Sequence, residues 1–315
     1  MNKAAVLIAE PVNEVLTQGL TAMDLLCEQK YNLTPTQLLE IIPRYEGIIV
    51  RSNITIDVPL INAASKLRFI GRTGSGMEKI AVAYAEQKGI KCFSSPEGNK
   101  DAVAEHVMGF MLSMLKNISS SNLDMRQLQW TRQNNTGNEL YNKTVGIVGF
   151  GNVGQALAER LVPFGCKILA YDKYRKNFST EKWQECDLRH IFEQADIVSL
   201  HVPLTAETQQ WIDTKWFDSF RKPIYFINTC RGEVVNTSAL IDELKNGKVK
   251  AAALDVFENE NFATLTPTQK HNVAILASMP NVILTPHIAG VTHESNYKLS
   301  AVLLKKIQEF YLMSN

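Results

Sequence analysis

The sequence predicts an α/β protein with two domains, each a parallel sheet covered by helices. Three observations predict this class. The chain has 315 residues, more than one hydrophobic core usually supports. Short β-rich runs alternate with longer helical patterns along its length, which is typical of parallel α/β architecture. After Lys143, six such runs follow one another, the number of strands in a complete doubly wound sheet.

The first part of the chain begins this alternation. Apolar runs predict strands at Ala4–Ala9, Gly47–Val50 and Leu67–Gly71, and Pro35–Ile42 predicts a helix between them. The N-terminal apolar run ends at Glu10. It is too short for a signal peptide, so we expect the first strand there.

A long helix is predicted over residues 101–118, with Asp101 as its N-cap. Its apolar positions cover more of the helix surface than one core face requires. Two explanations stay open. The helix is either an inner helix within one chain, or it is buried partly against a second subunit.

The second α/β series forms one sheet, and a single helix follows it. The predicted strands are Thr144–Gly149, Lys167–Tyr171, Ile197–His201, Tyr225–Asn228, Ala251–Leu254 and Val282–Leu284. The helix predicted at Thr292–Tyr311 is too small to form a domain. We therefore expect residues 98–286 to form a domain inserted into an outer domain of residues 1–97 and 287–315.

The composition limits the partners. Hydrophobic residues make up 45% and charged residues 21% of the chain, and the formal net charge is +1. This balance argues against nucleic acid or an anionic membrane as partner, although a local basic pocket for a small anion stays open. No apolar run approaches the ~20 residues that span a bilayer.

The five cysteines are scattered, without a CxxC pair, so we expect no metal site, no disulfide framework and a cytoplasmic location.

Residues 144–154 place a glycine-rich turn between a strand and a helix. Gly149, Gly151 and Gly154 form a GxGxxG pattern in the setting that predicts a dinucleotide-binding turn. The first glycine permits the turn, the second lets the backbone approach a pyrophosphate, and the third lets helix and strand pack closely. N–H groups at the helix N-terminus favour the negative charge.

Asp172 ends the next predicted strand. A carboxylate there can accept both ribose hydroxyls of NAD and would repel the 2′-phosphate of NADP, so NAD is the expected cofactor. The neighbouring Lys173, Arg175 and Lys176 argue in the other direction.

Polar residues follow three later strands of the same sheet. Because the carboxyl ends of parallel strands face the ligand crevice, Arg231, Asp255, Glu260 and His287 can converge there. An arginine suits a bidentate bond to a substrate carboxylate. A histidine suits proton exchange with a hydroxyl group during hydride transfer, and a carboxylate can orient it. We expect Arg231, Glu260 and His287 to be catalytic.

Together these motifs resemble the D-isomer-specific 2-hydroxyacid dehydrogenase family. The matching segments are VGIVGFGNVG (145–154), YD (171–172), HVPLTAETQQ (201–210), NTCRGEVV (228–235), ALDVFENE (253–260) and TPHIAG (285–290). The resemblance implies two Rossmann-like or flavodoxin-like domains, a cleft between them and a homodimer. It assigns the catalytic glutamate to Glu260 rather than Glu258. It implies cofactor contacts at Gly149, Gly151, Asn152, Val153, Gly154, Asp172, Val202, Pro203, Thr208, Thr229, Cys230, Arg231, Asp255, His287 and Gly290.

The N-terminal segments are similar to those of the D-3-phosphoglycerate dehydrogenase branch. The similar segments are IIVRSNIT (48–55), FIGRTGSGMEKI (69–80) and PEGNKDAVAEH (96–106). The similarity implies that backbone N–H groups of Gly74, Ser75 and Gly76 hold the substrate carboxylate and that Arg51 and Arg72 bind a phosphate. It also implies that Arg132 reaches the site of the other subunit.

The expected activity is therefore NAD-dependent oxidation of D-3-phosphoglycerate to 3-phosphohydroxypyruvate. Erythronate-4-phosphate dehydrogenase, glyoxylate or hydroxypyruvate reductase, and an NAD(H)-sensing corepressor-like binding protein stay as alternatives. The sequence departs from the family pattern at Asn236, where aspartate is usual, and in the long stretch 261–281. With about 28 residues after His287, we expect no C-terminal regulatory domain.

Overall fold

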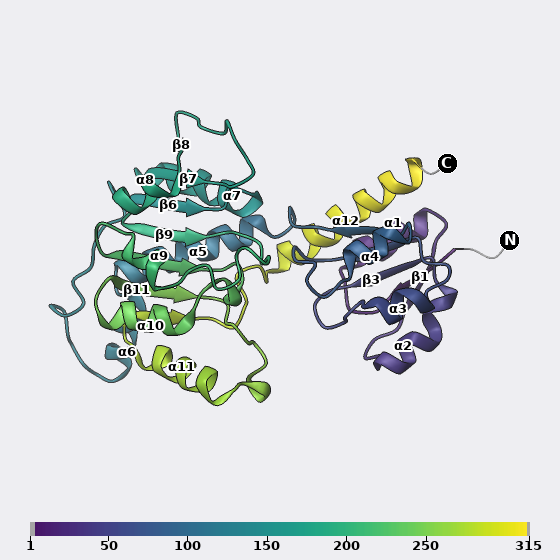
Figure 1. Ribbon diagram of the computed structural model, residues 1–315, viewed down its shortest axis with the longest axis horizontal. Coiled ribbons are helices and arrows are strands. Elements are labelled where there is room, and N and C mark those ends of the chain that lie inside the picture. The colour runs from purple at the N-terminus through teal and green to yellow at the C-terminus, as the bar shows by residue number, and fades with distance from the viewer. Residues whose placement is uncertain (1–3, 314–315) are drawn as a thin grey trace. The chain divides into compact units, whose positions relative to one another are not determined.

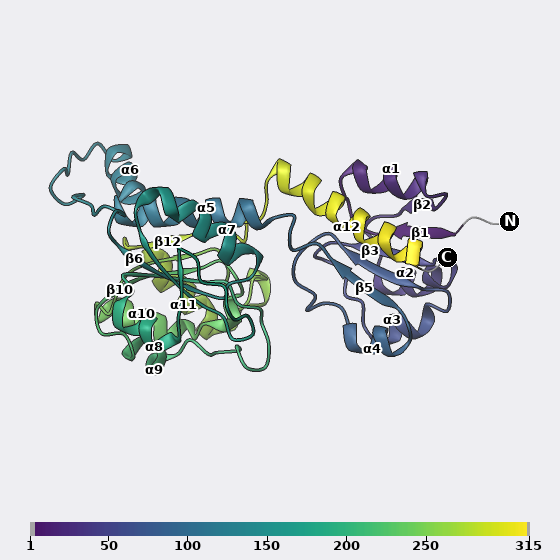
Figure 2. The same cartoon turned by 90° about the horizontal axis from the view of Figure 1, so that it is seen from above.

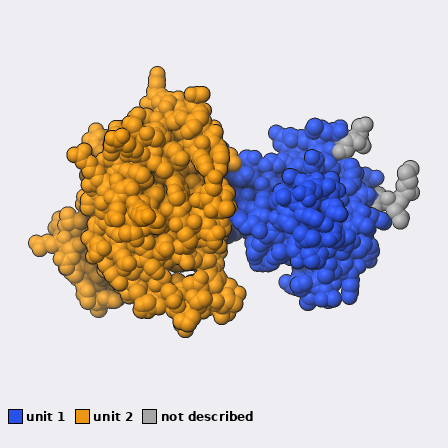
Figure 3. Space-filling model, viewed as in Figure 1, with its two compact units in different colours: residues 1–100, 291–315 blue, residues 101–290 orange. Residues whose placement is uncertain are grey.

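The computed structural model describes residues 4–313 and contains two compact units (Figures 1 and 3). Unit 1 comprises residues 1–100 and 291–315, and unit 2 comprises residues 101–290. The bounds expected from the sequence, after residues 97 and 286, fall a few residues earlier. Each unit is a parallel sheet covered by helices on both faces, so the expected α/β class is confirmed.

Unit 1 holds a five-stranded sheet in the order β2-β1-β3-β4-β5, which is the flavodoxin-like order. Its strands are β1 (Ala5–Ile8), β2 (Leu26–Gln29), β3 (Gly47–Val50), β4 (Phe69–Arg72) and β5 (Lys91–Ser94). Its helices are α1 (Glu14–Ala22), α2 (Pro35–Ile41), the 3-10 turn η1 (Ile42–Arg44), α3 (Val58–Ala63), α4 (Val82–Gln87) and α12 (His293–Met313).

Alternate side chains of the unit 1 strands point to opposite faces and build two cores. On one face, α1 and the returning C-terminal helix α12 pack side by side (Figure 2). Leu303 and Ile307 of α12 are buried there against Ile8 and Phe69. The helices α2, α3 and α4 cover the other face. The C-terminal helix α12 thus belongs to the same unit as the N-terminal strands.

Unit 2 holds a seven-stranded sheet in the order β12-β11-β10-β9-β6-β7-β8, the doubly wound order with one additional strand. Its strands are β6 (Thr144–Val148), β7 (Lys167–Tyr171), β8 (Gln184–Glu185), β9 (Ile197–Leu200), β10 (Ile224–Asn228), β11 (Val249–Leu254) and β12 (Val282–Leu284). Its helices are α5 (Lys100–Leu115), α6 (Ile118–Arg126), α7 (Asn152–Leu161), α8 (Leu188–Gln194), α9 (Thr214–Asp218), α10 (Thr237–Lys245) and α11 (Pro267–Ser278). The 3-10 turns are η2 (Val162–Phe164), η3 (Gly232–Val234) and η4 (Phe262–Thr264).

The long helix α5 is an inner helix of unit 2. Eight of its side chains, from Val103 to Leu115, are buried within the single chain, which accounts for its broad apolar surface. The helix ends at Leu115 because Asn117 takes a left-handed backbone with φ of 53°. The prediction that Asp101 is the N-cap is wrong. Asp101 lies inside the first turn, and its carboxylate pairs with Arg160 at 3.0 Å.

Candidate active site

The glycine turn after β6 uses its three glycines differently. Gly149 has a left-handed φ of 97°, and a Cβ atom there would lie 2.4 Å from the carbonyl oxygen of His201. A Cβ atom on Gly154 would lie 2.2 Å from the carbonyl oxygen of Gly149. These two glycines are required by the fold itself.

Gly151 has a different role. It precedes the first residue of α7, and a Cβ atom there would meet no atom of the described chain within 4 Å, beyond its sequence and helix neighbours. A side chain is sterically allowed at this position in the protein alone. The open space in front of the helix N-terminus therefore fits a pyrophosphate, which the backbone can approach closely.

The Asp172 carboxylate, just after β7, is fixed by backbone donors. Phe150 donates its N–H to Oδ2 at 2.8 Å, and Tyr174 and Arg175 donate theirs to Oδ1 at 2.9 Å each. Partial burial would raise the pKa of Asp172, but these bonds outweigh burial and leave the pKa below its ordinary value. The group is an anion beside the glycine turn, as acceptance of ribose hydroxyls requires.

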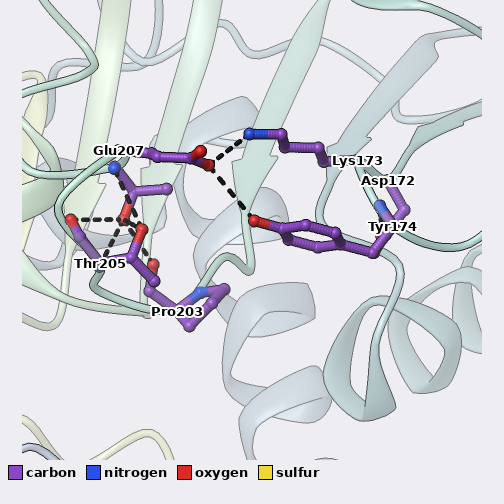
Figure 4. A network of polar contacts seen from close by, with 7 residues as sticks. Asp172, Lys173, Tyr174, Pro203, Thr205 and Glu207 are labelled. Carbon is purple, nitrogen blue, oxygen red and sulfur yellow. Dashed lines mark hydrogen bonds and ion pairs between the residues drawn. The ribbon is translucent and has the colours of Figure 1, made fainter.

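The cations near Asp172 have partners of their own. Figure 4 shows the Lys173 ammonium and the Tyr174 hydroxyl both directed at the Glu207 carboxylate, with the tyrosine bond at 3.2 Å. Arg175 donates to the carbonyl oxygen of Phe150 at 2.6 Å, and Lys176 to that of Asp172 at 3.2 Å.

Glu207 lies in the loop that follows β9. Thr208 closes this loop by donating its hydroxyl to the carbonyl oxygen of Pro203 at 2.7 Å. Pro203 and Thr208, two expected cofactor contacts, therefore share one turn, and Val202 directly precedes it.

Arg231 lies in a turn after β10 that Asn228 organises. The Asn228 side chain accepts the N–H of Cys230 at 3.0 Å and donates to the carbonyl oxygen of Arg231 at 2.9 Å. Burial raises the pKa of the Cys230 thiol to about 11, so the thiol stays protonated and is unsuited to act as a nucleophile.

The segment after β11 approaches the Arg231 turn closely. A Cβ atom on Gly232 would lie 1.9 Å from the carbonyl carbon of Phe257, so this contact needs glycine. Glu258 turns back and accepts the N–H of Thr237 at the start of α10, at 2.9 Å. That contact leaves Glu260 as the glutamate that meets His287.

His287 and Glu260 form a hydrogen-bonded pair, with Nδ1 and Oε2 2.8 Å apart. The bond to Glu260 raises the pKa of His287 above its ordinary value, while partial burial opposes the increase. Asp255 also raises this pKa and the Arg231 guanidinium lowers it. The pKa of His287 thus depends on the other three residues that the sequence predicted to converge with it.

The backbone of His287 takes a left-handed conformation, with φ of 54°. Its N–H donates to the carbonyl oxygen of Asp255 at 2.8 Å, and the next two N–H groups, of Ile288 and Ala289, donate to the Asp255 carboxylate at 2.8 Å each. Asp255, expected as a cofactor contact, therefore also holds the chain that carries His287 and leads into Gly290.

The buried hydroxyl of Thr229, in the turn after β10, is suited to bind a ligand. Thr229 is buried, and its hydroxyl has no hydrogen-bond partner among residues 4–313. A buried hydroxyl without a partner is costly, and a bound ligand could supply the missing bond. Together with the space at Gly151 and the anionic Asp172, Thr229 makes unit 2 suited to a dinucleotide.

The candidate substrate residues of unit 1 lie at the ends of two paired strands. Arg51 follows β3, and Arg72 ends the neighbouring strand β4, opposite Val50. The turn of Gly74, Ser75 and Gly76 comes next. Arg132 is not among them, because it belongs to unit 2.

The sequence did not indicate the groups that hold these two arginines. The buried Glu10 carboxylate accepts the N–H groups of Arg51, Ser52 and Asn53 at 2.6, 3.2 and 3.0 Å. Glu78 pairs with Arg72 at 3.6 Å. A carboxylate at the end of the buried strand β1 was the available signal for Glu10.

Across residues 4–313, none of the helices has the length and apolar character needed to span a bilayer.

A doubly wound sheet with this glycine turn and this histidine–glutamate pair defines a nucleotide-dependent oxidoreductase. A family model described as "D-isomer specific 2-hydroxyacid dehydrogenase, NAD binding domain" matches residues 108–289. The chain belongs to the D-isomer-specific 2-hydroxyacid dehydrogenase family, and its cofactor is NAD.

The chain is similar to two kinds of curated relatives. It is 34% identical to a hydroxypyruvate reductase of Thermotoga maritima, over 98% of each chain. It is 33% identical to a D-3-phosphoglycerate dehydrogenase of Archaeoglobus fulgidus, over 96% of this chain but 56% of that one. The chain thus spans little more than half the length of that phosphoglycerate dehydrogenase.

Solved structures agree with the fold. The D-lactate dehydrogenase of Aquifex aeolicus, in complex with NAD and lactic acid, superimposes with a TM-score of 0.84 at 27% identity, covering 98% of this chain and 95% of that one. A D-2-hydroxyisocaproate dehydrogenase has a TM-score of 0.85 at 24% identity, covering 99% of this chain and 98% of that one.

Proposed function

We propose that this dehydrogenase oxidises D-3-phosphoglycerate to 3-phosphohydroxypyruvate, the step that leads towards serine. The observation that carries the proposal is that Arg51 directly follows β3 and Arg72 ends the neighbouring strand β4, just before the turn of residues 74–76. Two guanidinium groups near the carboxyl ends of neighbouring strands suit a phosphate, and the backbone N–H groups of a glycine turn suit a carboxylate. An unphosphorylated hydroxy acid needs only the second of these.

The catalytic roles follow from unit 2. Bound NAD would supply the hydride acceptor, or as NADH the hydride donor, for C2 of the acid. His287 accepts the hydroxyl proton on its Nε2 atom, since Nδ1 faces Glu260. Glu260 stabilises the resulting imidazolium, and Arg231 holds the substrate carboxylate by two parallel bonds.

Hydroxypyruvate reduction is a second candidate, and a specific contact favours it. Arg72 already has the Glu78 carboxylate 3.6 Å away, which weakens its attraction for a phosphate. The Thermotoga maritima relative, matched over almost its whole length, carries the name hydroxypyruvate reductase.

We further propose that the enzyme is a cytoplasmic homodimer. The segment from α6 to the start of β6 carries large apolar side chains that one chain leaves exposed, among them Leu128 at 93% and Trp130 at 81%. A patch of this kind is typical of a protein interface. Arg132 lies in the same segment, so it would lie close to the partner subunit in such a dimer. The five scattered cysteines suit a reducing compartment.

A substrate panel tests the proposal. Oxidation of NADH is followed with phosphohydroxypyruvate, hydroxypyruvate, glyoxylate and pyruvate, and reduction of NAD with 3-phosphoglycerate and erythronate 4-phosphate. The highest kcat/KM is expected for the phosphoglycerate pair. Activity on unphosphorylated acids alone would refute the phosphate assignment. Tight NADH binding without turnover on any acid would instead indicate a dinucleotide-sensing protein.

A further inference from the structure

Three polar side chains from separate elements meet behind the His287 turn. They are His106 of α5, Asp255 after β11 and Thr285 after β12. We propose that His106 and Thr285 are positioning residues that act through Asp255 to hold His287 in its left-handed conformation. The inference rests on the proposed acid–base role of His287 and assigns two further residues to the same reaction.

Asp255 is the central member of this group. It has no exposed surface, and it receives the three consecutive N–H groups of residues 287–289, one on its carbonyl oxygen and two on its carboxylate. These bonds fix the chain on both sides of the His287 Cα atom. A residue with a Cβ atom is disfavoured at the φ of 54° found there, so the turn depends on such bonds.

The hydrogen bonds in the group have a defined direction. Thr285 donates its hydroxyl to Oδ1 of Asp255, over 2.5 Å. The Thr285 oxygen is then free to accept from His106, whose Nε2 atom lies 3.2 Å away. His106 therefore carries its proton on Nε2, and the chain of donation runs from His106 through Thr285 to Asp255.

Helix α5 holds His106, the first donor of this hydrogen-bond chain, in place. The His106 ring is packed edge-on against Phe110 one turn later, with the ring centroids 4.4 Å apart. Burial lowers the pKa of His106, although Asp255 opposes this, and the lowered pKa favours a neutral ring that donates as an ordinary N–H group. Without this donor or the Thr285 hydroxyl, the Asp255 carboxylate loses one of its side-chain restraints and the His287 turn loosens.

Paired substitutions test the inference. Thr285→Val removes the hydroxyl while keeping the shape, and Thr285→Ser keeps the hydroxyl. His106→Leu removes the donor, and His106→Gln keeps an N–H near the Nε2 position. We expect Thr285→Val and His106→Leu to lower kcat about tenfold, equal to about 1.4 kcal/mol. Thr285→Ser and His106→Gln should recover most of that loss.

Two further measurements separate positioning from a general structural role. The NADH dissociation constant and the thermal unfolding temperature should stay close to wild type in all four variants, and Ser113→Ala elsewhere on α5 serves as control. The double variant His106→Leu/Thr285→Val should lose no more kcat than Thr285→Val alone, because the two residues act in one chain.

The outcomes distinguish this inference from the proposed function. Wild-type kcat in Thr285→Val and His106→Leu would overturn the inference, as would equal losses in the Val and Ser variants. His287→Ala is assayed in parallel. Near-normal turnover in that variant would overturn the proposed acid–base role instead.

Discussion

The Nδ1 atom of His287 lies 2.8 Å from Oε2 of Glu260, and the two side chains come from loops after different strands of one sheet. Under the proposed acid–base role, this pair leaves the Nε2 atom of His287 to exchange a proton with substrate. It also raises the pKa of His287, so the imidazolium persists to higher pH than an isolated histidine would allow. Proton donation, and hence reduction, is favoured below that pKa.

The pair predicts a pH dependence with a definite sign. Reduction of the oxoacid needs protonated His287, so kcat/KM should fall as the pH rises through the raised pKa. Glu260→Gln removes the main cause of the increase, although Asp255 still raises the pKa and Arg231 still lowers it. The descending limb should therefore move to lower pH, and the ascending limb of oxidation with it. Profiles measured in both directions check this, and an unmoved limb would contradict the assignment.

Removal of the imidazole should affect chemistry and not cofactor binding. We expect His287→Ala to lower kcat by about 10²–10⁴-fold, the usual contribution of a positioned acid–base group. The NADH dissociation constant, measured by fluorescence, should change little. His190→Ala, at an exposed histidine on α8, is the matched control and should keep wild-type kcat.

The substrate assignment predicts a selective effect at Arg51. A charge-assisted bond to phosphate contributes about 1.5–3 kcal/mol, so Arg51→Ala should raise KM for phosphohydroxypyruvate about ten- to a hundredfold. KM for glyoxylate, which has no phosphate, should change little. Arg44→Ala, an exposed arginine at the end of η1, is the control. Equal effects on both substrates would argue for a general role in loop structure.

Cofactor selectivity should depend on Asp172 far more than on the ion pair next to it. Asp172 is held by three backbone N–H groups, so its carboxylate stays beside the glycine turn, where we expect it to repel a 2′-phosphate. Lys173 and Glu207 are exposed, and such pairs contribute little. We expect Asp172→Ser to raise the NADPH to NADH ratio of kcat/KM at least tenfold, and Glu207→Gln to change it less than about fivefold. The opposite ranking would show that Lys173 governs the choice.

Sequence patterns predicted the elements that carry strong local signals. The strands β6, β7 and β9–β12, the glycine turn and the four polar residues after β10, β11 and β12 all follow from periodicity and the geometry of parallel sheets. Among the edge strands, β12 was predicted, and β2, β5 and β8 were not. β2 and β5 are half-exposed without a continuous apolar run, and β8 has only two residues.

The residues that support the site from behind could not be predicted from the sequence, for a different reason. Glu10 and His106 gain their roles from partners 41 or more residues away in the chain, and no local pattern encodes such contacts. In the sequence, His106 is a lone histidine next to Glu105 at the start of a mostly apolar stretch of helix, which is equally typical of a histidine with no role. Tertiary structure is needed to separate the two cases.

Two glycines of the turn after β6 allow effects on folding and effects on cofactor binding to be measured separately. Gly149→Ala places a Cβ atom 2.4 Å from the His201 carbonyl oxygen on a left-handed backbone, so we expect it to destabilise the fold by several kcal/mol. Gly151→Ala meets no atom of the described chain within 4 Å, and it should keep the wild-type unfolding temperature. Its methyl group would occupy the space into which the pyrophosphate must fit, so the NADH dissociation constant should rise at least tenfold.

Thermal unfolding with and without NADH measures both effects. Added NADH should stabilise the wild-type protein and fail to stabilise Gly151→Ala at the same concentration. If NADH stabilised both proteins equally, the pyrophosphate would have to lie away from this turn.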